Sequence, residues 1–229
     1  MAYSVPFSCG YCRGSCKRKG RWGAVQLLRC VACGKYQRSS YKRMAHTPGL
    51  DDRITMLTRE GCGIRSTGRV LGISPTTVIT RIKRIAARLA PGPIPKGRSY
   101  EVDELSTFVG HKKNRVWVAY AVDRSTKDVV GMRVGKRSKR MLRPLVDTLL
   151  LSEAKRIHTD GCDSYPALIP ANIHRVKRFA TNGIERMNLT LRTCLKRLAR
   201  RTICYSKSEA MLAACLAIVC WTCLMPYPR

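Results

Sequence analysis

The chain has 229 residues, 44 of them Lys or Arg and 14 Asp or Glu, so its formal net charge is +30. Its hydrophobic content of 45% is enough to bury a core, which excludes a disordered basic tail. So large a positive charge predicts a polyanionic partner: nucleic acid first, an anionic membrane surface second, with a basic structural protein as the third alternative.

Residues 1–45 predict a zinc ribbon. Two CxxC motifs, "CGYC" and "CVAC", are separated by seventeen residues and supply Cys9, Cys12, Cys30 and Cys33. Four thiolates at this spacing suit tetrahedral Zn²⁺ as a structural ion. The intervening "RWGAVQLLRC" is typical of a β-hairpin. A redox role is the alternative, but it does not explain two copies in one small basic module. The absence of an apolar signal segment before so many cysteines indicates a reducing compartment.

Residues 46–90 predict three helices arranged as a helix-turn-helix. "GCG" ends the first helix, and Ser74 with Pro75 caps and opens the third. A plain three-helix bundle with a solvated basic face is the alternative. The face of the third helix opposite its apolar stripe suits the base edges and phosphates of a DNA major groove. That face carries Thr76, Thr77, Thr80, Arg81, Lys83 and Arg84.

Residues 91–99, "PGPIPKGRS", predict a stiff linker, because three prolines in five positions cannot continue a helix. We place a domain boundary here. The remaining residues, 100–229, predict a mixed α/β domain. Three β-rich runs at 100–110, 114–123 and 128–135 read as an antiparallel meander. A helix at 138–154, a short strand at 155–161 and a long helix at 183–201 follow. This order is similar to the ribonuclease-H-like fold.

The longest apolar run, residues 210–225, is shorter than the roughly 20 residues that span a bilayer. Ser206 and Glu209 precede it with the spacing of a capping box. We therefore expect a buried C-terminal helix and no membrane association.

Three acidic residues are candidates for a shared site. Asp103 lies in the first strand of this domain, Asp160 closes the fourth, and Glu185 opens the long helix. Strand ends meet at one rim of a sheet, and clustered carboxylates in so basic a protein require a cation. Oxygen ligands of this kind suit two Mg²⁺ or Mn²⁺ ions, which catalyse phosphoryl transfer.

The choice of acids is not settled by spacing alone. "EVDE" also offers Glu101 and Glu104 in place of Asp103, and alternation along the strand does not decide among them. Asp163 is an alternative to Asp160. Glu185 has the alternative role of a favourable charge at a helix N-terminus.

Neighbouring residues extend the candidate site. Arg192 follows Glu185 by two helical turns and shares its face, where it is suited to a phosphate near the metals. Asn188 lies on that face between them. His158 precedes Asp160 by two residues and is expected to be structural.

Several of these motifs together resemble the transposases of the insertion sequence one family, in the DDE superfamily. The resemblance spans the paired CxxC motifs, "GCGIRSTGRVLGISPTTV", "VDEL", "TDGCDSY", "IERMNLTLR" and "YSKSEAML". It implies that Asp103, Asp160 and Glu185 are the three catalytic acids, joined by Arg192 and Asn188. It also implies a prokaryotic enzyme of the cytoplasm and nucleoid that acts as a homodimer or higher oligomer on double-stranded DNA.

The resemblance further implies a reaction. The enzyme would bind the terminal inverted repeats of its element, cleave their 3′ ends and transfer the freed strands to target DNA. Three alternatives remain: a non-catalytic, sequence-specific DNA-binding regulator, a recombinase with a covalent tyrosine or serine, and a structural RNA-binding protein.

Overall fold

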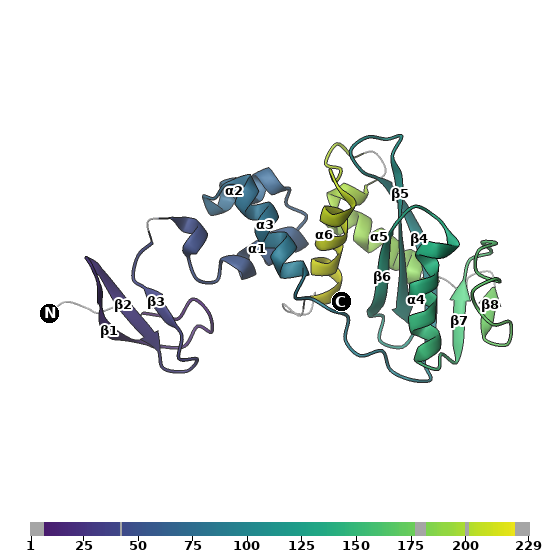
Figure 1. Cartoon of the computed structure of the whole chain (residues 1–229), viewed down its shortest axis with the longest axis horizontal. Helices are drawn as coiled ribbons and strands as arrows, with labels where there is room; N and C mark the ends of the chain where they lie inside the picture. The colour runs from purple at the N-terminus through teal and green to yellow at the C-terminus, as the bar shows by residue number, and fades with distance from the viewer. Residues whose placement is uncertain (1–6, 42, 177–181, 200–201, 223–229) are drawn as a thin grey trace.

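The computed structural model describes residues 7–222 except 42, 177–181 and 200–201. The predicted ends of two helices, at 200–201 and 223–225, therefore lie outside the described residues. Figure 1 shows a small sheet near the N-terminus, a group of helices beside it, and a larger sheet flanked by helices at the other end.

The small sheet contains three antiparallel strands in the order β1-β2-β3. β1 (Cys16–Trp22) and β2 (Val25–Cys30) form the predicted hairpin, which is longer than expected, and β3 (Tyr36–Arg38) adds a strand that the sequence did not indicate. Every residue of β1 after Cys16 is exposed. A short 3₁₀ helix, η1 (Met44–His46), leads out of this sheet.

The three predicted helices are present as α1 (Leu50–Arg59), α2 (Ile64–Leu71) and α3 (Pro75–Ala86). The Ser74 side chain accepts a hydrogen bond from the Thr77 amide and caps α3, as predicted.

The larger sheet is mixed, with the strand order β6-β5-β4-β7-β8. The predicted antiparallel meander is confirmed: β4 (Ser99–Phe108) pairs with β5 (Arg115–Asp123), and β5 pairs with β6 (Val129–Gly135). The predicted strand before Asp160 is β7 (Arg156–Thr159), which is parallel to β4. The fold class is therefore mixed α/β.

Strand β8 (His174–Val176) lies parallel to β7 at the sheet edge and was not predicted. Its three residues are too few to show alternation. β8 is extended because it pairs with β7, and each of the three β8 residues has a partner in that strand.

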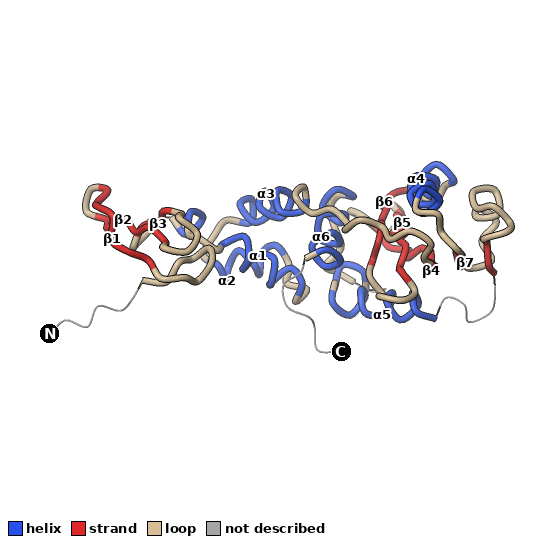
Figure 2. The backbone as a smooth tube through the Cα atoms, turned by 90° about the horizontal axis from the view of Figure 1, so that it is seen from below, coloured by secondary structure: helices blue, strands red, loops and turns tan. Residues whose placement is uncertain are grey.

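Helices cover both faces of the larger sheet (Figure 2). α4 (Lys139–Leu151) packs on one face, where Leu145 and Leu149 meet Val102 and Ala121. α5 and α6 lie on the other face.

Helix α5 (Asn182–Cys194) is shorter than the predicted helix of residues 183–201. The chain becomes extended at Leu195, then forms the 3₁₀ helix η2 (Lys196–Leu198). Leu195 and Leu198 are both buried in the core beneath the sheet. Tertiary packing of these two leucines therefore overrides the helical periodicity of the sequence.

Helix α6 (Glu209–Trp221) is apolar around its whole circumference. This composition suits its position, because the larger sheet covers one side of the helix and the three-helix group covers the other. Leu212 and Leu216 pack in the core under β5 and β6, whereas Cys215 and Ile218 pack with α1 and α3. The C-terminal helix is thus buried, as predicted, and it joins the three-helix group to the larger sheet. Within the described residues, each helix is too short or too polar to span a bilayer.

The predicted cap of α6 is wrong. Ser208, not Ser206, accepts the hydrogen bond from the Met211 amide, and Glu209 is the first residue of the helix. Ser206 is buried and its hydroxyl accepts a hydrogen bond from Arg197. The sequence spacing of a capping box is met, but tertiary contacts use Ser206 elsewhere.

Candidate functional site

The four cysteines of the paired motifs lie together, with their sulfur atoms all within 4.8 Å of one another. Cys9 Sγ is 3.7 Å from Cys33 Sγ, and Cys12 Sγ is 3.4 Å from Cys30 Sγ. Tetrahedral Zn²⁺ with Zn–S bonds of about 2.3 Å holds its sulfurs roughly 3.8 Å apart, so these thiols need to move little. The cluster is compatible with structural zinc.

Backbone amides prepare two of these sulfurs for the thiolate state. The Cys33 amide donates to Cys30 Sγ at 3.4 Å, and the Tyr11 amide donates to Cys9 Sγ at the same distance. The hydrogen bond from Cys33 is the main cause that lowers the pKa of Cys30 to about 6. Thiolate is the form that binds zinc.

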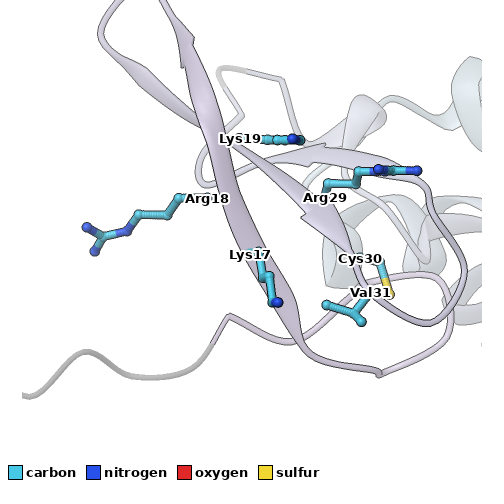
Figure 3. A pocket seen from close by; sticks show the side chains of 6 residues that line it. All are labelled: Lys17, Arg18, Lys19, Arg29, Cys30 and Val31. Carbon is cyan, nitrogen blue, oxygen red and sulfur yellow. The ribbon is translucent and has the colours of Figure 1, made fainter.

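Next to the cysteines, β1 and β2 present a cationic hollow of about 320 Å³. Figure 3 shows its lining residues: Lys17, Arg18, Lys19, Arg29, Cys30 and Val31. Trp22 lies at the end of the same hairpin and its ring is exposed. Arg38 of β3 lies over this ring, with 4.7 Å between the guanidinium carbon and the ring centroid.

The predicted DNA-binding face of α3 is only partly free. Thr76, Thr80 and Lys83 are exposed, whereas Thr77 shares a 2.8 Å hydrogen bond with the cap residue Ser74. The two arginines of this face pair with α1.

Asp51 on α1 pairs with both predicted arginines. Its two carboxylate oxygens accept hydrogen bonds from Arg81 Nη1 at 2.8 Å and from Arg84 Nη2 at 2.9 Å. Arg81 also donates to the carbonyl of Ala45 at 2.7 Å. Arg81 therefore ties α3 to α1 and to the segment before it, while Arg84 keeps a more exposed side chain.

The acids of "EVDE" separate onto the two faces of β4. Glu101 and Asp103 face α5, where Glu101 accepts a hydrogen bond from the Ile184 amide. Glu104 lies on the α4 face and accepts two hydrogen bonds from Arg137, at 3.2 and 2.8 Å. Both glutamates are buried and each forms an ion pair with an arginine, although Glu104 Oε1 has no hydrogen-bond partner. Asp103 is partly exposed, so it is the acid of this strand best placed to bind a ligand.

A chain of hydrogen bonds holds Asp103. Asn188 Nδ2 donates to Asp103 Oδ2 at 2.7 Å, and the buried Tyr120 hydroxyl donates to Asn188 Oδ1 at 2.8 Å. Burial raises the pKa of Asp103, and the nearby carboxylate of Asp160 raises it further. The ionised form of Asp103 is therefore destabilised, and a bound cation would stabilise it.

Asp160 lies beside Asp103 at the end of β7. The β4–β7 register aligns Glu101 with His158, and each aspartate follows its partner in that pair by two residues. Asp160 is exposed, and its Oδ1 accepts a hydrogen bond from the Cys162 amide at 3.2 Å. Asp163 is exposed in the loop beyond.

Glu185 is exposed in the first turn of α5, one helical turn before Asn188. The three acids are less tightly grouped than the cysteines. In the part of the chain that the structure describes, only the cysteine cluster brings three or more ligand atoms within 4.8 Å of one another. Asp103 and Asp160 interact electrostatically, and α5 carries Glu185 along the same side of β4.

Arg192 and His158 make structural contacts. Arg192 Nη1 donates to the carbonyl of Leu198 at 2.7 Å, and Nη2 lies 3.5 Å from the carbonyl of Ser106. His158 Nε2 is 2.9 Å from Arg124 Nη1, and burial lowers the pKa of His158. A neutral ring that accepts from Arg124 agrees with the expected structural histidine; phosphate binding by Arg192 stays a prediction.

Comparison with known proteins places this chain in a family. A family model described as IS1 transposase matches residues 99–217. The chain belongs to the IS1 transposase family. Its relatives include the insertion element iso-IS1n protein InsB of Shigella dysenteriae, 39% identical over 108 residues, which are 47% of this chain and 82% of the relative. The IS1 protein InsB of Shigella flexneri is 36% identical with the same coverage.

A third relative, the IS1 9 protein InsB of Escherichia coli (strain K12), is 31% identical over 138 residues, 58% of this chain and 83% of the relative. Among solved structures, a cryo-EM structure of the simian T-cell lymphotropic virus intasome in complex with PP2A regulatory subunit B56 gamma matches at 16% identity and a TM-score of 0.38. It covers 77% of this chain and 76% of that chain. A likeness this loose carries no conclusion.

Two residues near the acids of this IS1-family transposase were not singled out from the sequence. Tyr120 orients Asn188, and Arg137 joins Glu104 while stacking on Trp117, 4.6 Å from the ring centroid. A tyrosine in an apolar, buried strand must place its hydroxyl against a partner, and Tyr120 lies in such a strand. Arg137 carries no local signal, because it is one of many exposed cations.

Arg137 also belongs to a basic segment that runs from the end of β6 into α4. β6 and β7 both run parallel to β4. The C-terminal ends of β6 and β7 therefore point to the same end of the sheet, where Asp160 lies. The exposed cations of this segment are Arg133, Lys136, Arg137, Lys139, Arg140 and Arg143.

Proposed function

We propose that this transposase binds the terminal inverted repeats of its element, cleaves their 3′ ends and joins the freed strands to target DNA. Asp103, Asp160 and Glu185 are the catalytic acids of this proposal, with Asn188 and Arg192 beside them. The observation that carries it is the hydrogen-bonded link from Asp103 on β4 to Asn188 on α5, one turn from Glu185, with Asp160 at the neighbouring strand end.

The sheet supports a ribonuclease-H-like catalytic domain in residues 100–229. Its strand order, three antiparallel strands followed by two parallel ones, is the order expected of that fold. In this arrangement β4 and β7 lie side by side and run in the same direction, so Asp103 within β4 is level with Asp160, which directly follows β7.

The donor set fits Mg²⁺ or Mn²⁺. It consists of carboxylate oxygens, one of them on a buried aspartate whose pKa is raised by burial and by its acidic neighbour. Two such ions, when bound, activate a water or a 3′-hydroxyl and stabilise the leaving oxygen of an in-line phosphoryl transfer. The protein's part is to fix Asp103 through Asn188 and to present Asp160 and Glu185 on the same side of the sheet.

Positive charge supports a path for DNA to these acids. The basic segment of β6 and α4 would hold phosphates next to Asp160, through contacts that do not depend on base sequence. The exposed residues of α3, as the recognition helix of a helix-turn-helix, and the cationic zinc ribbon would read the inverted repeat. Two element ends in one complex would require at least a homodimer.

The alternative is a non-catalytic, sequence-specific DNA-binding regulator that uses residues 1–90 alone. In that case the acids are structural or solvated, and their replacement leaves every activity of the protein intact.

Cleavage of a duplex that carries one inverted-repeat end separates these functions. We expect Mg²⁺-dependent nicking by the wild type, inhibition by EDTA, and at least a 100-fold loss in Asp160→Asn and Glu185→Gln. Asp163→Asn is the matched control, because it removes the same charge three residues along the same loop and should cleave normally. Equal cleavage by Asp160→Asn and wild type would refute the catalytic assignment.

A further inference from the structure

The start of α5 is attached to β4 by a buried carboxylate. Glu101 Oε2 accepts a hydrogen bond from the Ile184 backbone amide at 2.8 Å, and the glutamate is only 2% exposed. The first amides of a helix have no partner within the helix, and a carboxylate is favourable there because of the helix dipole. A residue 83 positions away thus supplies a cap for the helix that carries Glu185.

Gly183 allows this approach. A Cβ atom at this position would lie 2.8 Å from Glu101 Oε2 and 3.0 Å from Glu101 Oε1. Carbon atoms do not come so close to carboxylate oxygens, so a side chain at Gly183 would displace either the Glu101 carboxylate from its partners or α5 from β4. The backbone of α5 therefore rests directly on the Glu101 carboxylate.

The second oxygen of Glu101 is also occupied. Arg124 Nε donates to Glu101 Oε1 at 3.0 Å, and its Nη1 lies 2.9 Å from His158 Nε2. Arg124 thereby neutralises the buried carboxylate and links it to β7, the strand that ends just before Asp160. One network joins the elements that carry all three acids: β4, β7 and α5.

We propose that Glu101 is a positioning residue that sets the distance between Glu185 and the aspartates. It does not bind metal or DNA itself, since its side chain is only 2% exposed and its charge is neutralised by Arg124. β4 then fixes two acids at once: Asp103 directly, and Glu185 through Glu101 and the first turn of α5. This inference rests on the proposed catalytic function.

Replacement of Glu101 tests the idea. Glu101→Gln puts an amide in place of the oxygen facing Arg124 or the one facing Ile184, so one of the two contacts is lost. Gly183→Ala keeps every polar group and only adds the obstructing carbon. Replacement of a group that orients a metal ligand through a hydrogen bond typically lowers metal affinity or activity by about 10- to 100-fold. We expect both variants to raise the Mg²⁺ concentration for half-maximal cleavage by at least about 10-fold.

A matched control separates positioning from general loss of stability. Leu149→Ala removes a fully buried side chain on the opposite face of the sheet and leaves the Glu101 network in place. All three variants should melt at lower temperature than the wild type, but only Glu101→Gln and Gly183→Ala should change the metal requirement. Mn²⁺ binding to the complex with uncleavable DNA, followed by the electron paramagnetic resonance of the free ion, provides a readout besides activity.

The outcomes are distinct. A wild type that cleaves with Mg²⁺, with both network variants needing ten times more metal and binding Mn²⁺ more weakly, supports the inference. Unchanged metal requirement in both variants, or an equal change in Leu149→Ala, overturns it while the proposed function stands. A wild type that shows no metal-dependent cleavage overturns the proposed function first.

Discussion

The hydroxyl of Tyr120 decides which way the Asn188 amide points. It donates to Asn188 Oδ1 at 2.8 Å and lies 3.2 Å from the Ile184 carbonyl. Burial raises the pKa of Tyr120 well above its ordinary value, so the hydroxyl stays protonated and remains a donor. With Oδ1 thus engaged, the amide nitrogen of Asn188 is the group that faces Asp103.

Tyr120→Phe removes this constraint and little else. One hydrogen bond of this kind contributes about 1 kcal/mol to stability, and Asn188 is only half-buried, so water can replace the lost donor. We therefore expect the free energy of unfolding to fall by only about 1 kcal/mol. The site should suffer more, because a rotated amide turns its oxygen toward the Asp103 carboxylate. We expect about 10-fold lower metal affinity, a difference of about 1.4 kcal/mol.

Chemical denaturation and Mn²⁺ binding measure the two effects separately. Tyr100→Phe is the control: its buried hydroxyl donates to the Pro95 carbonyl at 2.7 Å, on the opposite face of the same sheet. It should lose comparable stability without any change in metal affinity. If the two variants bind Mn²⁺ equally well, the orienting role of Tyr120 is refuted.

Four further outcomes are expected. Cys30→Ser should abolish the binding of one Zn²⁺ and unfold the small sheet, while the amide spectrum of the larger sheet stays the same; an unchanged amide spectrum of residues 8–38 would contradict this. Because burial and a like charge raise the pKa of Asp103, and only its ionised form binds metal, Mn²⁺ affinity should rise with pH through a midpoint above the ordinary 3.8; a midpoint at or below 3.8 would be inconsistent. Asp51→Asn should free two arginines, raise non-specific DNA affinity and steepen its dependence on salt, whereas unchanged affinity would show that α3 does not touch DNA. Ile54→Ala should lower the free energy of unfolding by about 2–5 kcal/mol in an equilibrium denaturation; a loss below about 1 kcal/mol would show that this fully buried residue is not in a packed core.

Much of the fold follows from local patterns in the sequence. The cap and proline that open α3, the apolar run of β5 and the turn residues between β5 and β6 are short-range signals, and these elements are confirmed. The cysteine cluster follows from the spacing of the two CxxC motifs, because the hairpin between them brings the motifs together.

Other features depend on contacts that no local pattern contains. β8 exists because β7 offers a free edge, and α5 ends at Cys194 because Leu195 and Leu198 turn into the core. Arg81, which the sequence predicts to contact DNA, also pairs with Asp51, and only the packing of α3 on α1 reveals this contact.

The acids illustrate both limits. Alternation along "EVDE" separates its residues into two faces but does not say which face meets a helix. The structure answers this through partners: Glu101 meets the α5 backbone and Glu104 meets Arg137, which leaves Asp103 beside Asn188. The choice of Asp103, Asp160 and Glu185 came from the resemblance to the insertion sequence one family, and their catalytic role stays a prediction.

The position of α6 limits how this protein can be divided for experiments. A fragment that stops at the proline-rich segment 91–99 would lack α6 and leave the buried faces of Leu50, Ile54, Val78 and Ile82 open to water. Such a fragment should self-associate or precipitate unless its surface is redesigned or α6 is supplied as a separate peptide. DNA-binding measurements on a truncated N-terminal half would then report the behaviour of an aggregate, so the intact chain is the proper starting material.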